Sequence, residues 1–271
     1  MLMSSYFANK VVAITGGTDG IGRALIDALV PLGAKIATCG RNHDKLYNLQ
    51  MQYANTLLHS EVCDVSNQED CRKFINSTVE IFGGIDILIN NAGISMRGLV
   101  NDTDVEVIRK VMDVNFFGSV YCTKFALPTL IARKGTIVGV SSIAGYRGLP
   151  GRSGYSASKF ALQGWLESLR TELMEKQVNV MWVSPYFTTS NIRNAALDEK
   201  GTPTGESLMN EGKMVSAAEC AQQILNAIEK HKRAAVFTLM GFTTVLLNRL
   251  LPSLTDKMIH KLYFKNGKLI K

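Results

Sequence analysis

Tyr155 and Lys159 are four residues apart in a segment whose apolar pattern becomes helical from Tyr155 onward. Residues four apart on a helix lie on one face, so a phenol and an ammonium would project together. A cation beside a phenol favours the phenolate and lowers its pKa towards neutrality. Such a tyrosine could exchange a proton with an alcohol or a carbonyl group at working pH. Alone, the pair is weak evidence, because the two residues often fall four apart on solvated helices.

The residues before this pair predict the elements that would position it. The apolar run 136–140 predicts a buried strand, and Ser141 and Ser142 follow at its end. A loop rich in glycine, proline and serine then leads to Tyr155. The hydroxyl of Ser142 could therefore hydrogen-bond the same substrate oxygen as the phenol.

Length and composition predict one large α/β domain. The chain has 271 residues, of which 46% are hydrophobic and 20% are charged, so it can bury a sizeable core. A net charge of +7 suits an anionic cofactor or an anionic membrane surface. Nucleic acid is not expected as a partner, because no basic run with interleaved aromatic residues occurs.

Cysteines and apolar runs indicate the compartment. The five cysteines are scattered and lack the spacing of metal ligands, so we expect reduced thiols, no metal site and a cytoplasmic protein. The first ten residues lack an apolar run of signal-peptide length. The longest apolar stretch, 234–247, has 14 residues, fewer than the ~20 that a membrane-spanning helix needs. No transmembrane span is expected.

A glycine-rich turn follows the first predicted strand, 10–14, and precedes a helix that begins near Ile21. Between a strand and a helix, glycines let the backbone approach a pyrophosphate, which the helix N-terminus attracts. In this position the turn is a specific signal for a dinucleotide. The expected contacts are Gly16, Thr18, Asp19, Gly20, Ile21 and Gly22.

The end of the second predicted strand, 34–39, indicates which dinucleotide is preferred. A site for NAD usually has an acidic residue there, to bind the ribose 2′-hydroxyl. Gly40 and Arg41 stand there instead, and an arginine fork fits a 2′-phosphate. We therefore expect NADP(H) to be preferred, with NAD(H) as the second option. The alternative is that Arg41 is an ordinary surface residue.

Two further strand ends supply candidate contacts. The strand near 57–62 leads to Asp64 and Val65, which we expect beside the adenine, and Ser66 with Glu69 predicts a capping box for the helix that runs to about Phe82. The strand 85–89 leads to small residues that would let the backbone lie against a cofactor. These are Asn91, Ala92 and Gly93.

The remaining chain continues the alternation of strand and helix. A helical region is expected over 104–133, broken at Gly118 and Pro128, and a helix over 155–176. Strands are expected at 178–183 and 234–239, with a mobile flap at 191–214 and a helix at 217–230 between them. Strands that are apolar on both faces indicate a parallel sheet covered on both sides. We predict a single doubly wound Rossmann-type domain of about seven strands over residues 1–271, with a core at 8–240 and an extension at 241–271.

Taken together, these motifs resemble the classical short-chain dehydrogenase/reductase family over about residues 8–240. The turn from Thr15 to Gly22 has that family's spacing, residues 90–93 match its Asn-Asn-Ala-Gly motif, and Ser142 precedes Tyr155 by 13 residues as in the family. The resemblance implies a catalytic tetrad, which consists of Asn115, Ser142, Tyr155 and Lys159.

The resemblance also implies a role for each member of the tetrad. Tyr155 would be the general acid/base, and Lys159 would hold the nicotinamide ribose and lower the tyrosine's pKa. Ser142 would polarise the substrate carbonyl, and Asn115 would anchor a water in a proton relay. For Asn115, purely structural hydrogen bonding is a serious alternative, because a buried asparagine among apolar neighbours needs partners.

Two positions depart from the family's pattern. Pro185 and Ser190 align with residues that contact the cofactor. Tyr186 follows Pro185 where the family commonly has glycine, and Ser190 stands where it commonly has threonine. The first departure suggests a reshaped nicotinamide pocket, whereas the second keeps a hydroxyl.

The resemblance implies an NADP(H)-dependent oxidoreductase that acts on a carbonyl compound or a secondary alcohol. Alternatives are a non-catalytic dinucleotide-binding sensor or scaffold, a lyase or epimerase on the same fold, and a reductase of a small polar carbonyl compound. The apolar residues 237–251, followed by basic ones, favour a lipid-like or steroid-like substrate. This extension could be a lid, a subunit interface or a peripheral membrane contact.

The two long predicted helices also bear on assembly. Helices 104–133 and 155–176 carry apolar side chains, among them Phe117 and Phe160, that one sheet face does not obviously cover. The family commonly pairs subunits through the corresponding helices. We therefore expect a homodimer or a homotetramer, and the alternative is that these side chains belong to the core.

Overall fold

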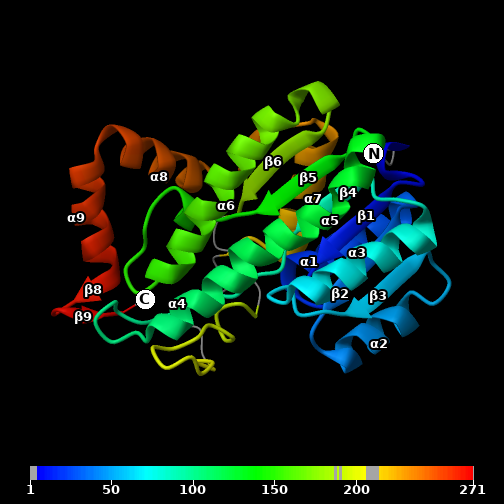
Figure 1. Ribbon diagram of the computed structural model, residues 1–271. Helices are drawn as coiled ribbons and strands as arrows, with labels where there is room; N and C mark the ends of the chain where they lie inside the picture. The colour runs from blue at the N-terminus through cyan, green and yellow to red at the C-terminus, as the bar shows by residue number, and fades with distance from the viewer. Residues whose placement is uncertain (1–4, 186–187, 189–190, 206–213, 271) are drawn as a thin grey trace.

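The computed structural model describes residues 5–185, 188, 191–205 and 214–270. Its centre is a seven-stranded sheet of order β3-β2-β1-β4-β5-β6-β7, in which every pair of neighbours is parallel (Figure 1). The strands are β1 (Val11–Thr15), β2 (Lys35–Gly40), β3 (Leu58–Val62), β4 (Ile87–Asn90), β5 (Thr136–Val140), β6 (Asn179–Ser184) and β7 (Ala234–Val236). The predicted fold class is confirmed.

The strand order reverses between β1 and β4, which follow one another in space but not in sequence. At such a point the loops that leave the strands' carboxyl ends turn in opposite directions and open a crevice. The glycine-rich turn follows β1, and residues 91–95 follow β4. The topology therefore brings the two motifs to one edge of the sheet.

Helices cover both faces of the sheet, and each face has its own apolar core. The residues that form the two cores are almost all aliphatic or small, because both faces of a parallel sheet are buried. One face is covered by α1 (Gly20–Leu29), α2 (His43–Gln52) and α7 (Ala217–Glu229). The other is covered by α3 (Gln68–Phe82), α5 (Gly118–Ala132) and α6 (Ser153–Glu172).

The helical region predicted at 104–133 consists of three parts, and its break differs from the prediction. Helix α4 (Val105–Met112) passes into a π-helical turn at Asp113–Phe117, and α5 then continues through Pro128 without interruption. Gly118 is the junction between the π-helical turn and α5. A Cβ at this position would lie only 2.9 Å from the Val65 side chain. Close packing against the end of β3 thus requires glycine at the start of α5.

The predicted cap of α3 was wrong by one residue. Asn67, not Ser66, accepts hydrogen bonds from the backbone N–H groups of Glu69 and Asp70. The hydroxyl of Ser66 instead donates to Asp64 Oδ1 at 2.7 Å. That contact holds the turn that follows β3.

The C-terminal extension is helical, which the sequence analysis did not predict. It forms α8 (Leu239–Leu250), α9 (Pro252–Tyr263) and a small antiparallel pair, β8 (Phe264–Lys265) with β9 (Lys268–Leu269). The side chain of Thr238 caps α8 and so ends β7 at Val236, before the predicted residue 239. Figure 1 shows α8 and α9, in orange and red, standing to one side of the sheet next to α6.

Arg147 ties this extension to the loop that leaves β5. Its Nη2 lies 2.6 Å from Asp256 Oδ1 in α9, and its Nη1 donates to Asn248 Oδ1 in α8 at 2.9 Å. Asn248 in turn donates to the carbonyl oxygen of Tyr146. The hairpin of α8 and α9 is thus held against the segment between β5 and α6. In the described part of the chain, no helix is long and apolar enough to cross a membrane.

Candidate active site

A cavity of about 780 Å³ opens at the carboxyl edge of the sheet and contains most of the predicted site. Its lining includes loops that follow β1 to β6, the start of α6, and residues of α8 and α9. The predicted residues that line it are Gly16, Thr18, Asp19, Gly20, Ile21, Arg41, Asp64, Val65, Asn91, Ala92, Gly93, Ser142, Tyr155, Lys159 and Pro185. Residues separated by more than 160 positions in sequence therefore meet in one site.

The glycine turn is locked to the end of β4. Thr15 Oγ1 accepts hydrogen bonds from the backbone N–H groups of Asn91 and Ala92, each at 3.0 Å. Asn91 Nδ2 donates to the carbonyl oxygens of Thr15 and Gly16. Gly22 does not line the cavity, but a Cβ there would collide with the carbonyl oxygen of Gly16. Its lack of a side chain is what lets the turn close.

The turn presents an open helix N-terminus to the cavity. Gly16 has a φ of +71°, in the left-handed region that favours glycine. Asp19 accepts the N–H of Gly20 at 2.7 Å and forms an ion pair with Lys45 at 2.9 Å. A site of this shape binds anions through backbone N–H groups and the helix dipole. The residues therefore fit a dinucleotide pyrophosphate.

Arg41 lies at the end of this cavity that is formed by β2. Its exposed side chain forms no ion pair with any residue that the structure describes. Gly40 packs against the side chain of Thr18, and a Cβ at Gly40 would lie 3.3 Å from it. A carboxylate at position 40 would crowd this contact, whereas Arg41 is available to an anionic group.

Lys159 is buried and held at the end of β5. Its side chain is 4% exposed, and its Nζ donates to the carbonyl oxygen of Val140 at 2.9 Å. Burial lowers the pKa of Lys159 to about 8, because a charged ammonium is poorly solvated there. Gly93 lies beside this ammonium; a Cβ on that residue would be in ordinary contact with Nζ but tight against Asn115 Oδ1, at 3.2 Å.

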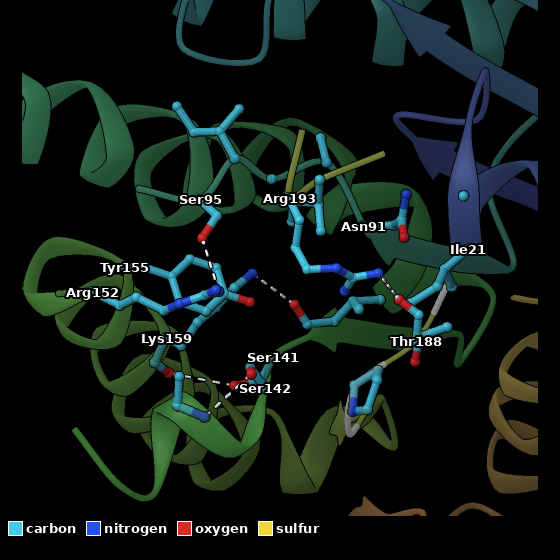
Figure 2. Close-up of a pocket in the computed structure, with 18 of the residues that line it drawn as sticks. Ile21, Asn91, Ser95, Ser141, Ser142, Arg152, Tyr155, Lys159, Thr188 and Arg193 are labelled. Atoms are coloured by element: carbon cyan, nitrogen blue, oxygen red, sulfur yellow. Dashed lines mark hydrogen bonds between the residues drawn. The ribbon is translucent and has the colours of Figure 1, made fainter. Parts of the chain in front are cut away.

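Tyr155 is half-buried, and its environment differs in one respect from the expected one. Burial raises the pKa of its phenol, while Ser142, Arg152 and Arg193 act in the opposite direction. Lys159 is not among the groups that lower it; the ammonium lies 5.7 Å from the centroid of the Tyr155 ring and is bonded to Val140. In the protein alone, two arginines supply the positive charge that the sequence analysis assigned to the lysine (Figure 2).

Asn115 is fully buried and lies behind the cavity rather than in its lining. Its Oδ1 accepts the N–H of Ile94 at 2.8 Å, and its Nδ2 donates to the carbonyl oxygen of Ile94 and to Ser158 Oγ. The side chain thus joins the segment after β4 to α6. In the protein without a cofactor, Asn115 therefore has the purely structural hydrogen bonds that the sequence analysis gave as the alternative role. The π-helical turn places the side chain between these two segments.

Tyr186, Ser190 and the second half of the predicted flap lie outside the described residues. The flap's first half, 191–205, is a series of turns in which Leu197 pairs with Met96 and with Pro203. The carbonyl oxygen of Thr188 accepts a hydrogen bond from Arg193, whose side chain is 7% exposed. Arg193 lines the cavity, so this segment contributes to the site.

Sequence reasoning missed two groups of lining residues. The first is polar and consists of Ser95, Arg152, Thr188 and Arg193. The second comes from α9 and is mainly apolar; it includes Met258, Ile259, Leu262 and Tyr263. Met240 and Leu247 of α8 also line the cavity, and both belong to the apolar stretch 237–251 that the sequence associates with a hydrophobic substrate. Arg152 precedes Tyr155 by three residues, so its place on the same helical turn was the available signal.

This arrangement can deliver a proton to an oxygen atom next to a bound dinucleotide. Ser142 lies two residues after the end of β5, and Tyr155 and Lys159 project from α6 into the same cavity. Among the described residues, no group of three or more metal-ligating side chains lies close enough to hold a metal ion.

Comparison with known proteins finds a matching family model and relatives of similar sequence. The family model for short chain dehydrogenase matches residues 10–201. "Dehydrogenase/reductase SDR family member 7B" of Mus musculus is 39% identical over 241 residues, which cover 86% of this chain and 75% of the relative. "Dehydrogenase/reductase SDR family protein 7-like" of Drosophila melanogaster is 33% identical, with 90% of this chain and 78% of the relative covered.

Two solved structures share the fold. A short chain dehydrogenase/reductase from Burkholderia phymatum, in complex with NAD, superposes with a TM-score of 0.80 at 23% identity, covering 94% of this chain and 96% of that one. A short-chain dehydrogenase from Streptomyces avermitilis gives a TM-score of 0.80 at 24% identity, covering 95% of this chain and all of that one. At these identities the likeness establishes the fold alone.

Proposed function

Because the chain belongs to the short-chain dehydrogenase/reductase family of oxidoreductases, we propose that it transfers hydride between NADP(H) and a carbonyl compound or the matching secondary alcohol. The observation that carries this proposal is the meeting of Ser142, Tyr155 and Lys159 with the glycine turn in one cavity. A non-catalytic sensor would have no need of a proton donor at this place.

The chain's own residues would bind and polarise the substrate. When bound, the nicotinamide supplies the hydride that the carbonyl carbon accepts. Ser142 and Tyr155 would hydrogen-bond the carbonyl oxygen, and the phenol would give that oxygen its proton. The product alcohol thus gains one hydride on carbon and one proton on oxygen. In the reverse direction the phenolate would take the proton back.

Lys159 and Asn115 would support this proton transfer. Lys159 has further N–H groups besides the one that it donates to Val140, and these would hold the nicotinamide ribose. Asn115 is a positioning residue on this proposal, because its amide fixes the segment that follows β4 and the start of α6. The backbone carbonyl oxygen of Asn115 accepts a hydrogen bond from Ser119 Oγ, and this oxygen would be the part of the residue that binds a relay water.

The remaining cofactor contacts would follow from the lining of the cavity. The turn would hold the pyrophosphate, Asp64 and Val65 would lie beside the adenine, and Arg41 would pair with the 2′-phosphate. Pro185 and Ser190 would complete the nicotinamide side. A preference for NADP(H) is supported by the absence of an acid at Gly40 and by the exposed guanidinium of Arg41.

A hydrophobic substrate is supported by α8 and α9. Apolar side chains of both helices line the cavity, so a substrate chain leaving Tyr155 would run along Met258 and Leu262. The same helices expose further apolar side chains on their outer side, namely Leu239, Phe242, Leu246, Leu250, Leu251 and Leu254. Together with Lys257, Lys261 and Lys265, this surface would suit peripheral contact of a cytoplasmic protein with an anionic membrane, which flotation with anionic vesicles tests.

The proposed role of the phenol is tested by Tyr155→Phe. We expect NADPH oxidation with a ketone to fall by at least ~10²-fold, the usual contribution of a general acid. The Kd for NADPH, measured by fluorescence, should change little, because the hydroxyl acts on the substrate. A phenylalanine variant that keeps more than a few per cent of the activity would show that another group donates the proton.

A further inference from the structure

Arg152 immediately precedes α6 and lines the cavity beside Tyr155 (Figure 2). Its side chain makes one weak hydrogen bond, from Nη1 to Ser95 Oγ at 3.5 Å. Its Nε is buried and has no hydrogen-bond partner. No carboxylate among the described residues forms an ion pair with it. A guanidinium whose buried Nε has no partner and whose one hydrogen bond is weak is incompletely satisfied, so this arginine can bind a group that the chain does not itself provide.

The charges around Arg152 strengthen this reading. Within the described lining of the cavity, the carboxylates are Asp19 and Asp64, which follow β1 and β3. Asp19 pairs with Lys45, and Asp64 accepts from Ser66. Arg152 stands beyond β5, on the other side of the strand order's reversal. The substrate half of the cavity is therefore positively charged.

Arg193 brings a second guanidinium to the same half of the cavity. It comes from the segment after β6, whereas Arg152 comes from the residue before α6; Figure 2 shows Arg152 lying next to Tyr155 and Arg193 pointing toward Thr188. Both arginines lower the pKa of the Tyr155 phenol, which indicates that their fields reach the reacting oxygen. An oxygen-rich anion near that oxygen would meet donors from two elements.

We infer that Arg152 binds an anionic group, a phosphate or a carboxylate, that the carbonyl substrate carries near its reacting carbon. This inference rests on the proposed function and names the class of its substrate. The Nε and an Nη of an arginine form a planar fork that matches two oxygens of such a group. With the apolar wall of α9 on the other side, the substrate is an anionic amphiphile whose ketone lies at Tyr155.

The inference is tested with two matched pairs of ketones of equal chain length. One pair is a 4-oxo acid and its methyl ester, and the other is a ketone with a neighbouring phosphate monoester and the neutral methyl ether. We expect the unmutated protein to have a kcat/KM about ten- to a hundredfold higher for the anionic member of at least one pair. The pair with the larger ratio distinguishes a phosphate from a carboxylate.

Three variants identify the residue responsible. Arg152→Gln should lower kcat/KM for the anionic member at least about tenfold more than for the neutral member, with the extra loss mainly in KM; any loss shared by both members reports the effect of Arg152 on the Tyr155 phenol. Arg152→Lys keeps the charge and should recover part of the loss. Arg109→Gln removes the same charge from an exposed position on α4 and should change neither ratio.

A binding measurement separates this inference from the proposed reaction. The anionic ketone alone should raise the melting temperature of the cofactor-free protein, and of Arg41→Ala, but not that of Arg152→Gln. If no ketone is turned over but this shift occurs, the proposed function fails and the anion site stands. Equal losses for both members of each pair in Arg152→Gln, or no preference for anions in the unmutated protein, would overturn the inference.

Discussion

The ammonium of Lys159 donates a hydrogen bond to the carbonyl oxygen of Val140, 2.9 Å away, and so joins helix α6 to the end of strand β5. This bond places a positive charge in a site that is only 4% exposed. This lysine is thus anchored by the protein's own residues. The same burial makes the residue unfavourable for folding at neutral pH.

The pH dependence of stability follows from Lys159. Burial lowers its pKa to about 8 from its ordinary value near 10.5, so between these two values the unfolded chain binds more protons than the folded one. The free energy of unfolding should therefore rise with pH across this window. Lys159→Met has no ammonium to bury, so at pH 7 its free energy of unfolding should exceed that of the unmutated protein. We expect this difference to shrink by a few kcal/mol between pH 7 and pH 10.5. Urea unfolding at several pH values measures the difference.

The matched control for this experiment is Lys124→Met, which removes an exposed lysine from α5. The difference in free energy of unfolding between Lys124→Met and the unmutated protein should vary much less with pH. A Lys159→Met difference that is flat between pH 7 and 10.5 would mean that burial does not lower the pKa of this lysine.

Arg41→Ala should change the cofactor preference. The guanidinium has no ion pair among the described residues, and a charge-assisted hydrogen bond contributes ~1.5–3 kcal/mol. We therefore expect the Kd for NADPH to rise about tenfold or more while the Kd for NADH stays the same, because NADH lacks the 2′-phosphate. Titration of both cofactors measures this. An equal loss of both cofactors, or equal kcat/KM for both in the unmutated protein, contradicts the proposed preference.

Arg147→Ala should loosen the hairpin of α8 and α9 from the site. Its guanidinium binds Asp256 and Asn248, so the variant removes the ion pair with α9 and leaves α8 with the bond from Asn248 to the carbonyl oxygen of Tyr146. For a series of ketones, kcat/KM should rise with chain length in the unmutated protein by up to ~0.8 kcal/mol per buried methylene. We expect the variant to flatten that rise. Arg249→Ala, an exposed arginine on α8, is the control and should preserve it.

Phe160→Glu should dissociate the proposed oligomer. Phe160 on α6 is 47% exposed and Phe117 beside α5 is 40% exposed, so the alternative that these side chains belong to the core is wrong for both. Tyr121 and Trp165 do pack against the core. Light scattering should show a dimer or tetramer for the unmutated protein and a monomer for the variant. Phe242→Glu, which changes a 56% exposed phenylalanine on α8, should leave the oligomer intact.

The sequence by itself determined the sheet, the glycine turn and the shared helix of Tyr155 and Lys159. Apolar runs such as 136–140 must be buried on both faces, so they specify parallel strands. The glycines from Gly16 to Gly22 and the spacing of Tyr155 and Lys159 are local features of the chain, although the contact of the turn with Asn91 is formed only in the fold. For these features, a prediction from local pattern was sufficient.

Only the tertiary structure decided which distant residues complete the site. Met258 follows Tyr155 by 103 residues, and Arg147 holds its helix in place through one ion pair that no periodicity reveals. The pKa of Tyr155 likewise depends on Arg152 and Arg193, which come from separate elements. Burial and Coulomb interactions depend on distance in space rather than along the chain. The substrate half of the cavity therefore follows from packing, whereas the cofactor half is readable in the sequence.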